Sequence, residues 1–196
     1  SDGSTVAIGA WQNNGNLSQA HGDTGHTRIY KWDGSSWNQL GSDIDGEAAG
    51  DYNGYSVSLS SDGSTVAIGA YGNDANGSAS GHTRIYQWDS ASSSWNQLGS
   101  DIDGEAAGDY SGYSVSLSSD GSVLAIGARF NDGNGTNSGH TRIYKWNGSS
   151  WNKLGSDIDG EAAGDLSGFS VSLSSDGSTV AIGAYLNDGS AENAGH

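Results

Sequence analysis

An eleven-residue block, GSDIDGEAAGD, occurs three times without change in this chain of 196 residues, beginning at Gly41, Gly99 and Gly155. A second phrase, SDGSTVAIGA, recurs around it with small changes and with periods of 60, 58 and 56 residues. Periods of this length indicate an array of supersecondary units, each of which cannot bury its own apolar face and therefore stacks on its neighbours. The repeat therefore constrains the fold more strongly than any single motif does.

Each period contains four short segments rich in apolar residues, separated by turns of Gly, Asp and Ser. In the second copy these segments are Tyr55–Ser60, Thr65–Ala70, His82–Trp88 and Trp95–Ile102. An Asp-Gly pair between the first two is typical of a tight hairpin turn. Because no helical apolar period runs for two turns, the sequence predicts an all-β protein of tandem four-stranded antiparallel units.

Such units are typical of β-propeller blades, and a β-solenoid array is the alternative fold. We predict a partial first repeat with strands 2–4, two complete repeats, and a partial fourth repeat with strands 1 and 2, at residues 1–52, 53–110, 111–166 and 167–196. Propeller rings hold about four to eight blades. We therefore expect the sequence to be a segment of a longer array.

Composition excludes several classes of function. The chain has no cysteine, so disulfides, thiolate catalysis and Cys-based zinc sites are ruled out. Its 23 acidic and 7 basic side chains give a formal charge of −16, which argues against nucleic-acid and anionic-membrane partners. No stretch approaches the roughly 20 apolar residues of a membrane span. We expect an extracellular or cell-surface location.

Three segments of the second copy, Gly54–Leu59, Val66–Ala70 and Gly81–Tyr86, resemble the first three strands of FG-GAP repeats in integrin α-chain propellers. The resemblance is closer to bacterial repeats of this type in large secreted proteins, and Phe169 restores the literal Phe-Gly-type pairing in the last copy. It covers essentially the whole chain and implies propeller blades. The calcium loop of integrin repeats is reduced here to Ser61–Ser64. The family's calcium site is therefore not implied for this chain.

The acidic block is the candidate metal site. Alternating carboxylates around a glycine turn can supply several of the six to eight oxygens that calcium requires. The candidate ligands are Asp43, Asp45, Glu47, Asp51, Asp101, Asp103, Glu105, Asp109, Asp157, Asp159, Glu161 and Asp165. The alternative is that these acids pair with arginines such as Arg84 on a neighbouring blade, or that they cap turns.

Histidine, arginine and tryptophan recur on the third strand of each unit. Residues two apart share a face of a strand, so each His–Arg pair points the same way. The candidate ligand-binding residues are His82, Arg84, Trp88, His140, Arg142 and Trp146. The alternative is structural: an arginine that anchors one blade to the next, and a tryptophan that pairs with a second tryptophan across the hairpin.

No catalytic motif is present, and identical copies argue against a single asymmetric active site. We therefore expect no enzymatic activity and no cofactor other than calcium. The predicted function is an extracellular repeat module for adhesion or for surface and matrix assembly. Its partners would be other copies of itself, neighbouring repeats, or surface glycans and proteins. The alternatives are a lectin-like glycan-binding propeller and a structural fibre of stacked repeats.

Overall fold

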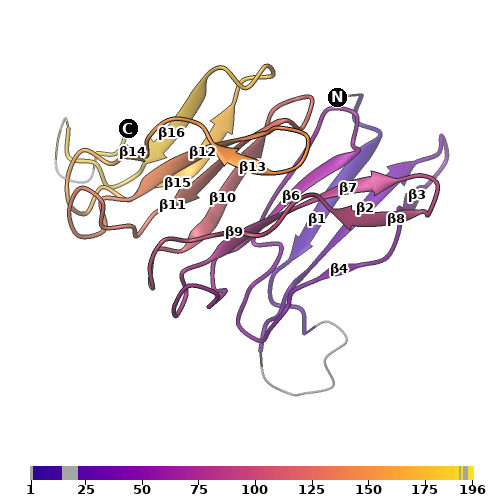
Figure 1. Ribbon diagram of the computed structural model, residues 1–196, viewed down its shortest axis with the longest axis horizontal. Coiled ribbons are helices and arrows are strands. Elements are labelled where there is room, and N and C mark those ends of the chain that lie inside the picture. The colour runs from indigo at the N-terminus through magenta and orange to yellow at the C-terminus, as the bar shows by residue number, and fades with distance from the viewer. Residues whose placement is uncertain (1, 15–21, 190, 192–193) are drawn as a thin grey trace.

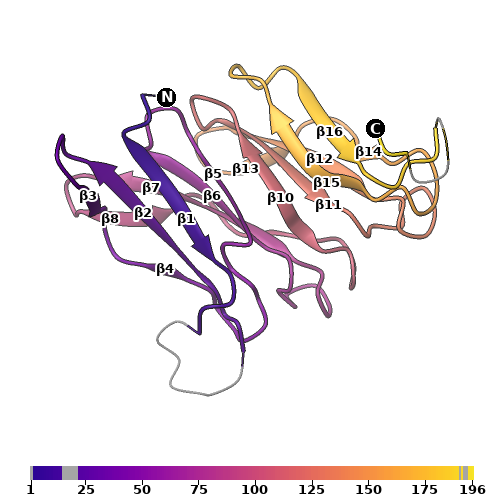
Figure 2. The same ribbon diagram turned by 180° about the vertical axis from the view of Figure 1, so that it is seen from behind.

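The computed structural model describes residues 2–14, 22–189, 191 and 194–196. In this part of the chain the regular elements are all β-strands, grouped in four antiparallel sheets. Figures 1 and 2 show the sheets following one another in chain order along the long axis of the molecule. The prediction of an all-β protein of tandem, propeller-like blades is therefore confirmed.

Each sheet uses consecutive segments of the chain. The first consists of β1 (Thr5–Ala10), β2 (His26–Trp32), β3 (Trp37–Gln39) and β4 (Ile44–Asp45). The second consists of β5 (Ser56–Leu59), β6 (Thr65–Ala70), β7 (His82–Asp89), β8 (Ser94–Gln97) and β9 (Ile102–Asp103). The third consists of β10 (Ser111–Leu117), β11 (Val123–Ala128), β12 (His140–Trp146), β13 (Trp151–Lys153) and β14 (Ile158–Asp159). The fourth consists of β15 (Ser167–Leu173) and β16 (Val180–Ala184).

The fourth strand of a unit differs from the prediction of one continuous segment, because two short strands replace it. In the second unit β8 and β9 both pair with β7, and a turn separates them. Gly99 lies in this turn with a φ of +84°, a left-handed conformation that glycine adopts without strain. The chain therefore leaves β7 after Gln97 and returns to it at Ile102.

The apolar core lies between units, because alternate residues of one strand face different neighbours. In β6, Val66 and Ile68 pack in a cluster with Ile29 of the preceding unit. Ala67, between them, packs in a second cluster that contains Leu124 of the following unit. All six residues of β6 are buried as a result.

Close stacking also requires glycine in the second strand of the first three units, at Gly9, Gly69 and Gly127. A Cβ atom on Gly69 would lie 2.0 Å from the backbone oxygen of Gly112 in the next unit. Real Cβ atoms do not approach a backbone oxygen so closely, so any larger residue would force the two units apart. The glycine near the end of the repeated phrase SDGSTVAIGA is thus required by the packing of one unit on the next.

We predict that Gly69→Ala destabilises the protein by about 1–3 kcal/mol, because the added methyl group overlaps backbone that cannot rotate away. Urea unfolding followed by circular dichroism would measure the loss. Gly183→Ala is the matched control, since its nearest neighbour is the side-chain oxygen of Ser170 at 2.4 Å and every other atom lies at 3.8 Å or beyond. Equal losses for the two variants would contradict this account of the packing.

Candidate functional site at the junctions between units

The last acid of each repeated block caps the turn in which it lies. Asp51 accepts hydrogen bonds from the backbone N–H groups of Glu47 (3.1 Å) and Ala48 (2.9 Å). Asp109 and Asp165 each accept one such bond, from the N–H groups of Ala106 and Ala162, the counterparts of Ala48. This geometry agrees with the turn-capping alternative of the sequence analysis.

The glutamates of the first two blocks reach across to the arginine of the next unit. The Nη1 atom of Arg84 lies 3.3 Å from Oε1 of Glu47, and Nη2 donates to the backbone oxygen of Asp45 at 2.8 Å. Arg142 repeats the arrangement with Glu105, at 3.4 Å, one junction further along the chain. The alternative pairing of block acids with arginines on a neighbouring unit is therefore present at both junctions.

A buried histidine lies beside each of these ion pairs. Nδ1 of His82 is 3.9 Å from Oε2 of Glu47 and 3.8 Å from Oδ2 of Asp101. Its side chain is 0% exposed, and neither ring nitrogen has a hydrogen-bond partner. His140 takes the same place in the next junction, with Nδ1 3.9 Å from Oε2 of Glu105.

Burial keeps these imidazoles neutral. Loss of solvation and, to a smaller extent, the neighbouring Arg84 lower the pKa of His82 to about 4, against the attraction of Asp101 and Asp51. Burial and Arg142 lower the pKa of His140 in the same way. Both rings therefore carry an available nitrogen lone pair at neutral pH.

The four acids of one block do not gather at one point. Among the described residues, histidine and carboxylate ligand atoms lie within 4.8 Å of one another in three groups: His26, Asp43 and Asp45; Glu47, His82 and Asp101; Glu105, His140 and Asp157. The remaining predicted ligands are in none of these groups: Asp51, Asp103, Asp109, Asp159, Glu161 and Asp165. The second block thus supplies Asp101 to the group around His82 and Glu105 to the group around His140.

The tryptophans pair across the hairpin, as the structural alternative predicted. The ring centroids of Trp88 and Trp95 are 5.4 Å apart, and Nε1 of Trp95 donates to the backbone oxygen of Leu40 in the preceding unit at 2.8 Å. A Cβ atom on Gly41 would lie 2.8 Å from Trp88. The predicted ligand-binding residue Trp88 is therefore packed against the unit before it. Trp146 occupies the same position against Gly99.

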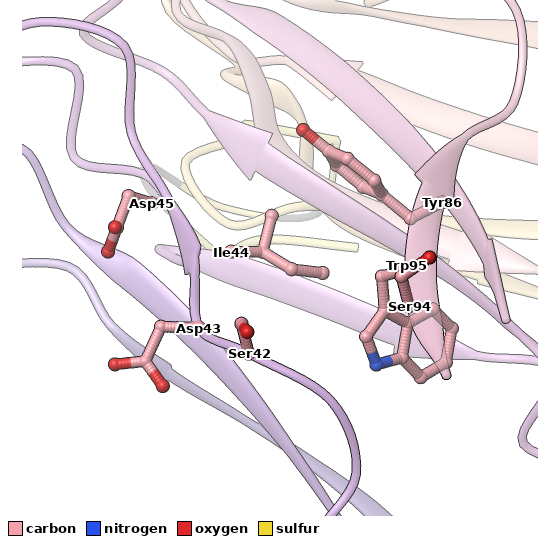
Figure 3. A pocket seen from close by; sticks show the side chains of 7 residues that line it. All are labelled: Ser42, Asp43, Ile44, Asp45, Tyr86, Ser94 and Trp95. Atoms are coloured by element: carbon pink, nitrogen blue, oxygen red, sulfur yellow. The ribbon is translucent and has the colours of Figure 1, made fainter. Parts of the chain in front are cut away.

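A cavity of about 270 Å³ lies beside this contact (Figure 3). Ile44 points from the acidic block toward Tyr86 and Trp95, while the carboxylates of Asp43 and Asp45 point the other way. On the side of the second unit, the cavity is therefore lined by the aromatic rings of Tyr86 and Trp95.

The sequence analysis missed a continuous row of aromatic rings that crosses all four units, here called the aromatic row. The row begins at Trp11 and ends at Tyr185, and in its middle the hydroxyl groups of Tyr55 and Tyr113 are 2.7 Å apart. Burial and this hydrogen bond raise the pKa of Tyr55 to about 12. The row contains Trp11, Tyr52, Tyr55, Tyr71, Tyr110, Tyr113, Phe130, Phe169 and Tyr185. An aromatic residue at the same repeat position in successive copies is the signal that could have revealed it.

Two segments of the chain match a known repeat family. Residues 42–86 and 102–144 match the family described as the FG-GAP repeat. A search of curated proteins finds no match. Among the described residues, no helix is long and apolar enough to cross a bilayer.

Two solved structures have a similar fold. A putative 6-phosphogluconolactonase from Bacteroides fragilis superposes with a TM-score of 0.51 at 9% identity, over 81% of this chain and 36% of that one. The periplasmic gluconolactonase of Pseudomonas aeruginosa gives 0.48 at 13% identity, over 92% and 50%. The chain thus spans half or less of the length of either protein.

The prediction that the chain is not an enzyme is withdrawn. It rested on missing motifs and on identical copies, whereas the putative 6-phosphogluconolactonase from Bacteroides fragilis has a similar fold. Neither missing motifs nor repeated units are therefore an argument against an enzyme with this architecture. At 9% identity the likeness concerns the fold alone and gives this chain no activity.

We predict that acid destabilises the chain in part through its buried histidines. The ordinary pKa of histidine is 6.5 and that of folded His82 is about 4, so between these values the unfolded chain binds more protons than the folded chain. Stability is therefore full above pH 6.5 and falls toward pH 4, by up to about 1.4 kcal/mol per pH unit for one histidine.

Urea unfolding at several pH values in this window, with a chelator present, would measure the slope. The charged groups that face His82 are Arg84 on its own strand, Asp101 beside it, and Glu47 and Asp51 from the preceding block. These remain in the His82→Asn variant, which should show a smaller slope. An unchanged slope would show that His82 takes up no additional proton on unfolding.

Proposed function

Because residues 42–86 and 102–144 match the FG-GAP repeat family, we propose that the chain is an extracellular module for adhesion or for surface and matrix assembly. Its partners are proteins or glycans, and the aromatic row is the surface that contacts them. The proposal rests on one observation: a single row of partly exposed rings continues from unit to unit.

The composition of the row suits a contact surface. Aromatic residues are enriched at protein interfaces because they bury a large area at a small cost in side-chain entropy. Tyr55, Tyr113 and Phe169 hold the same position in successive units and are partly exposed. Arg129 adds a cation, 3.9 Å from the ring centroid of Tyr113. These groups give a partner apolar area, hydroxyl groups and one positive charge.

Repetition converts weak contacts into firm attachment. When several weak sites are held in a fixed geometry, the second contact forms at a high effective concentration, and the gain can reach about 10² to 10⁴. Successive units carry an aromatic residue at the same repeat position, so a partner with its own repeated pattern can engage several units together. This supports adhesion to polymers and surfaces rather than to one small ligand.

Charge limits the kind of partner. The formal charge of −16 repels polyanions, while neutral or basic surfaces are not repelled. The putative 6-phosphogluconolactonase has a similar fold, and it contributes no activity to this proposal.

We predict that loss of exposed rings from the row weakens attachment. The chain would be displayed densely on beads and exposed to a glycan array and to surfaces coated with matrix glycoproteins. The double variant Tyr71→Ser/Tyr185→Ser should reduce bound beads at least about tenfold, since avidity multiplies the loss at each unit.

Trp37→Ser is the matched control, because Trp37 lies outside the row and is 46% exposed, close to the 47% of Tyr185. Binding to glycans alone would favour the lectin-like form of the proposal, and binding to proteins alone would favour the protein-adhesion form. No binding to any surface, or equal losses for the control and the double variant, would refute the role of the row.

A further inference from the structure

We propose that the junction between the first and second units is a binding site for a divalent transition-metal ion, Zn²⁺ by its donor set. The ligands are Glu47 of the first unit and His82 and Asp101 of the second. This inference is independent of the aromatic row and of the adhesive function proposed for it.

The observation that carries the site is the imidazole of His82. Its side chain is 0% exposed, and no hydrogen bond satisfies either ring nitrogen. A buried polar group without a partner is costly, which indicates a partner of another kind. Nδ1 faces two carboxylates, 3.9 Å from Oε2 of Glu47 and 3.8 Å from Oδ2 of Asp101.

Each carboxylate has one oxygen engaged elsewhere and the other free for an ion. Glu47 gives Oε1 to Arg84 and turns Oε2 toward His82. Asp101 accepts the amide of Gln97 at Oδ1 and turns Oδ2 toward the same nitrogen. Two carboxylates against one guanidinium leave a net negative charge beside a neutral imidazole, which favours a divalent cation.

The donor set selects the metal. An imidazole nitrogen with two carboxylate oxygens suits Zn²⁺, whereas Ca²⁺ and Mg²⁺ prefer oxygen ligands alone. Ligands at about 2.0–2.1 Å from a tetrahedral zinc ion lie about 3.3 Å apart. The two separations from Nδ1, 3.9 and 3.8 Å, exceed this value by about half an ångström, and the two carboxylate oxygens lie within 4.8 Å of each other. Glu47 is half exposed and has room to move toward the ion. Water would complete the coordination.

The equivalent groups in the other units are weakened by cations of the protein itself. Arg28 donates to both oxygens of Asp43 beside His26, at 2.8 to 3.0 Å. Lys153 forms an ion pair with Asp157 beside His140. Asp101 instead pairs with the neutral side chain of Gln97, which is the counterpart of Lys153. The first junction is therefore the strongest of the three sites among the described residues.

A bound ion would join two units, because Glu47 and the pair His82 and Asp101 come from opposite sides of the junction. Binding to the folded chain alone raises the melting temperature. Zinc at a hundredfold excess over Kd should raise it by about 5 °C or more in a chain of this size.

Isothermal titration of the metal-free chain, made without a histidine tag, with ZnCl₂ tests the site. We expect about one tightly bound ion, as the donor set predicts. MgCl₂ at matched ionic strength is the control for simple screening of the −16 charge. His82→Asn should weaken zinc binding at least about tenfold, since loss of even an outer-shell partner costs about that much.

Two further variants keep the test decisive if His82→Asn does not fold. Lys153→Gln removes the competing ammonium and should raise the stoichiometry toward about two, because it makes the second junction like the first. Glu47→Gln should weaken zinc binding, while Glu161→Gln, at the same block position but outside the three groups, should not. Equal heats for zinc and magnesium, or equal effects of Glu47→Gln and Glu161→Gln, would overturn the proposal.

Discussion

Burial of each unit by its neighbours is the constraint on which the rest of this structure depends. Val66 and Ile68 of β6 are fully buried only because the preceding unit covers them. Ile8, the counterpart of Ile68 in the first unit, is 51% exposed, because no preceding unit covers it among the described residues. Apolar burial contributes about 25 cal/mol per Å². Stability therefore resides in the interfaces, and a unit taken alone would lose most of its core.

The same stacking organises the polar groups. When both faces of a strand are buried, the polar side chains on those faces must find hydrogen-bond or ion-pair partners within the protein. Arg84 does so by bonding the backbone oxygen of Asp45 and pairing with Glu47 across the junction. The second acidic block thereby contributes to two junctions. Its Asp101 lies beside His82 at the first junction, and its Glu105 lies beside His140 and Arg142 at the second. The cluster around His82 is formed by this overlap, and its position follows from the packing of the repeats.

Much of the fold could be predicted because apolar alternation and turn residues are local signals. The second and third strands begin and end close to the predicted positions. The break between β8 and β9 could not be predicted, because the conformation of Gly99 matters only once both segments pair with β7. At the site, arginine pairing and turn capping were foreseen as alternatives to calcium. The grouping of His82 with acids from two blocks was not, because it depends on contacts between units that no spacing within one unit reveals.

Near-identical copies make the few differing positions the most informative ones. Stacking requires the shared residues, so individual properties of a unit must come from those that vary. The position after the second strand is Trp11, Tyr71, Arg129 or Tyr185 in the four units. In the third unit Arg129 therefore places a guanidinium, instead of a ring, against Tyr113 and Phe130. The position that faces the first aspartate of each block is Gln39, Gln97 or Lys153. These substitutions change charge at sites whose backbone is otherwise repeated. An array of this kind can therefore keep one architecture while its junctions and its aromatic row differ in what they bind.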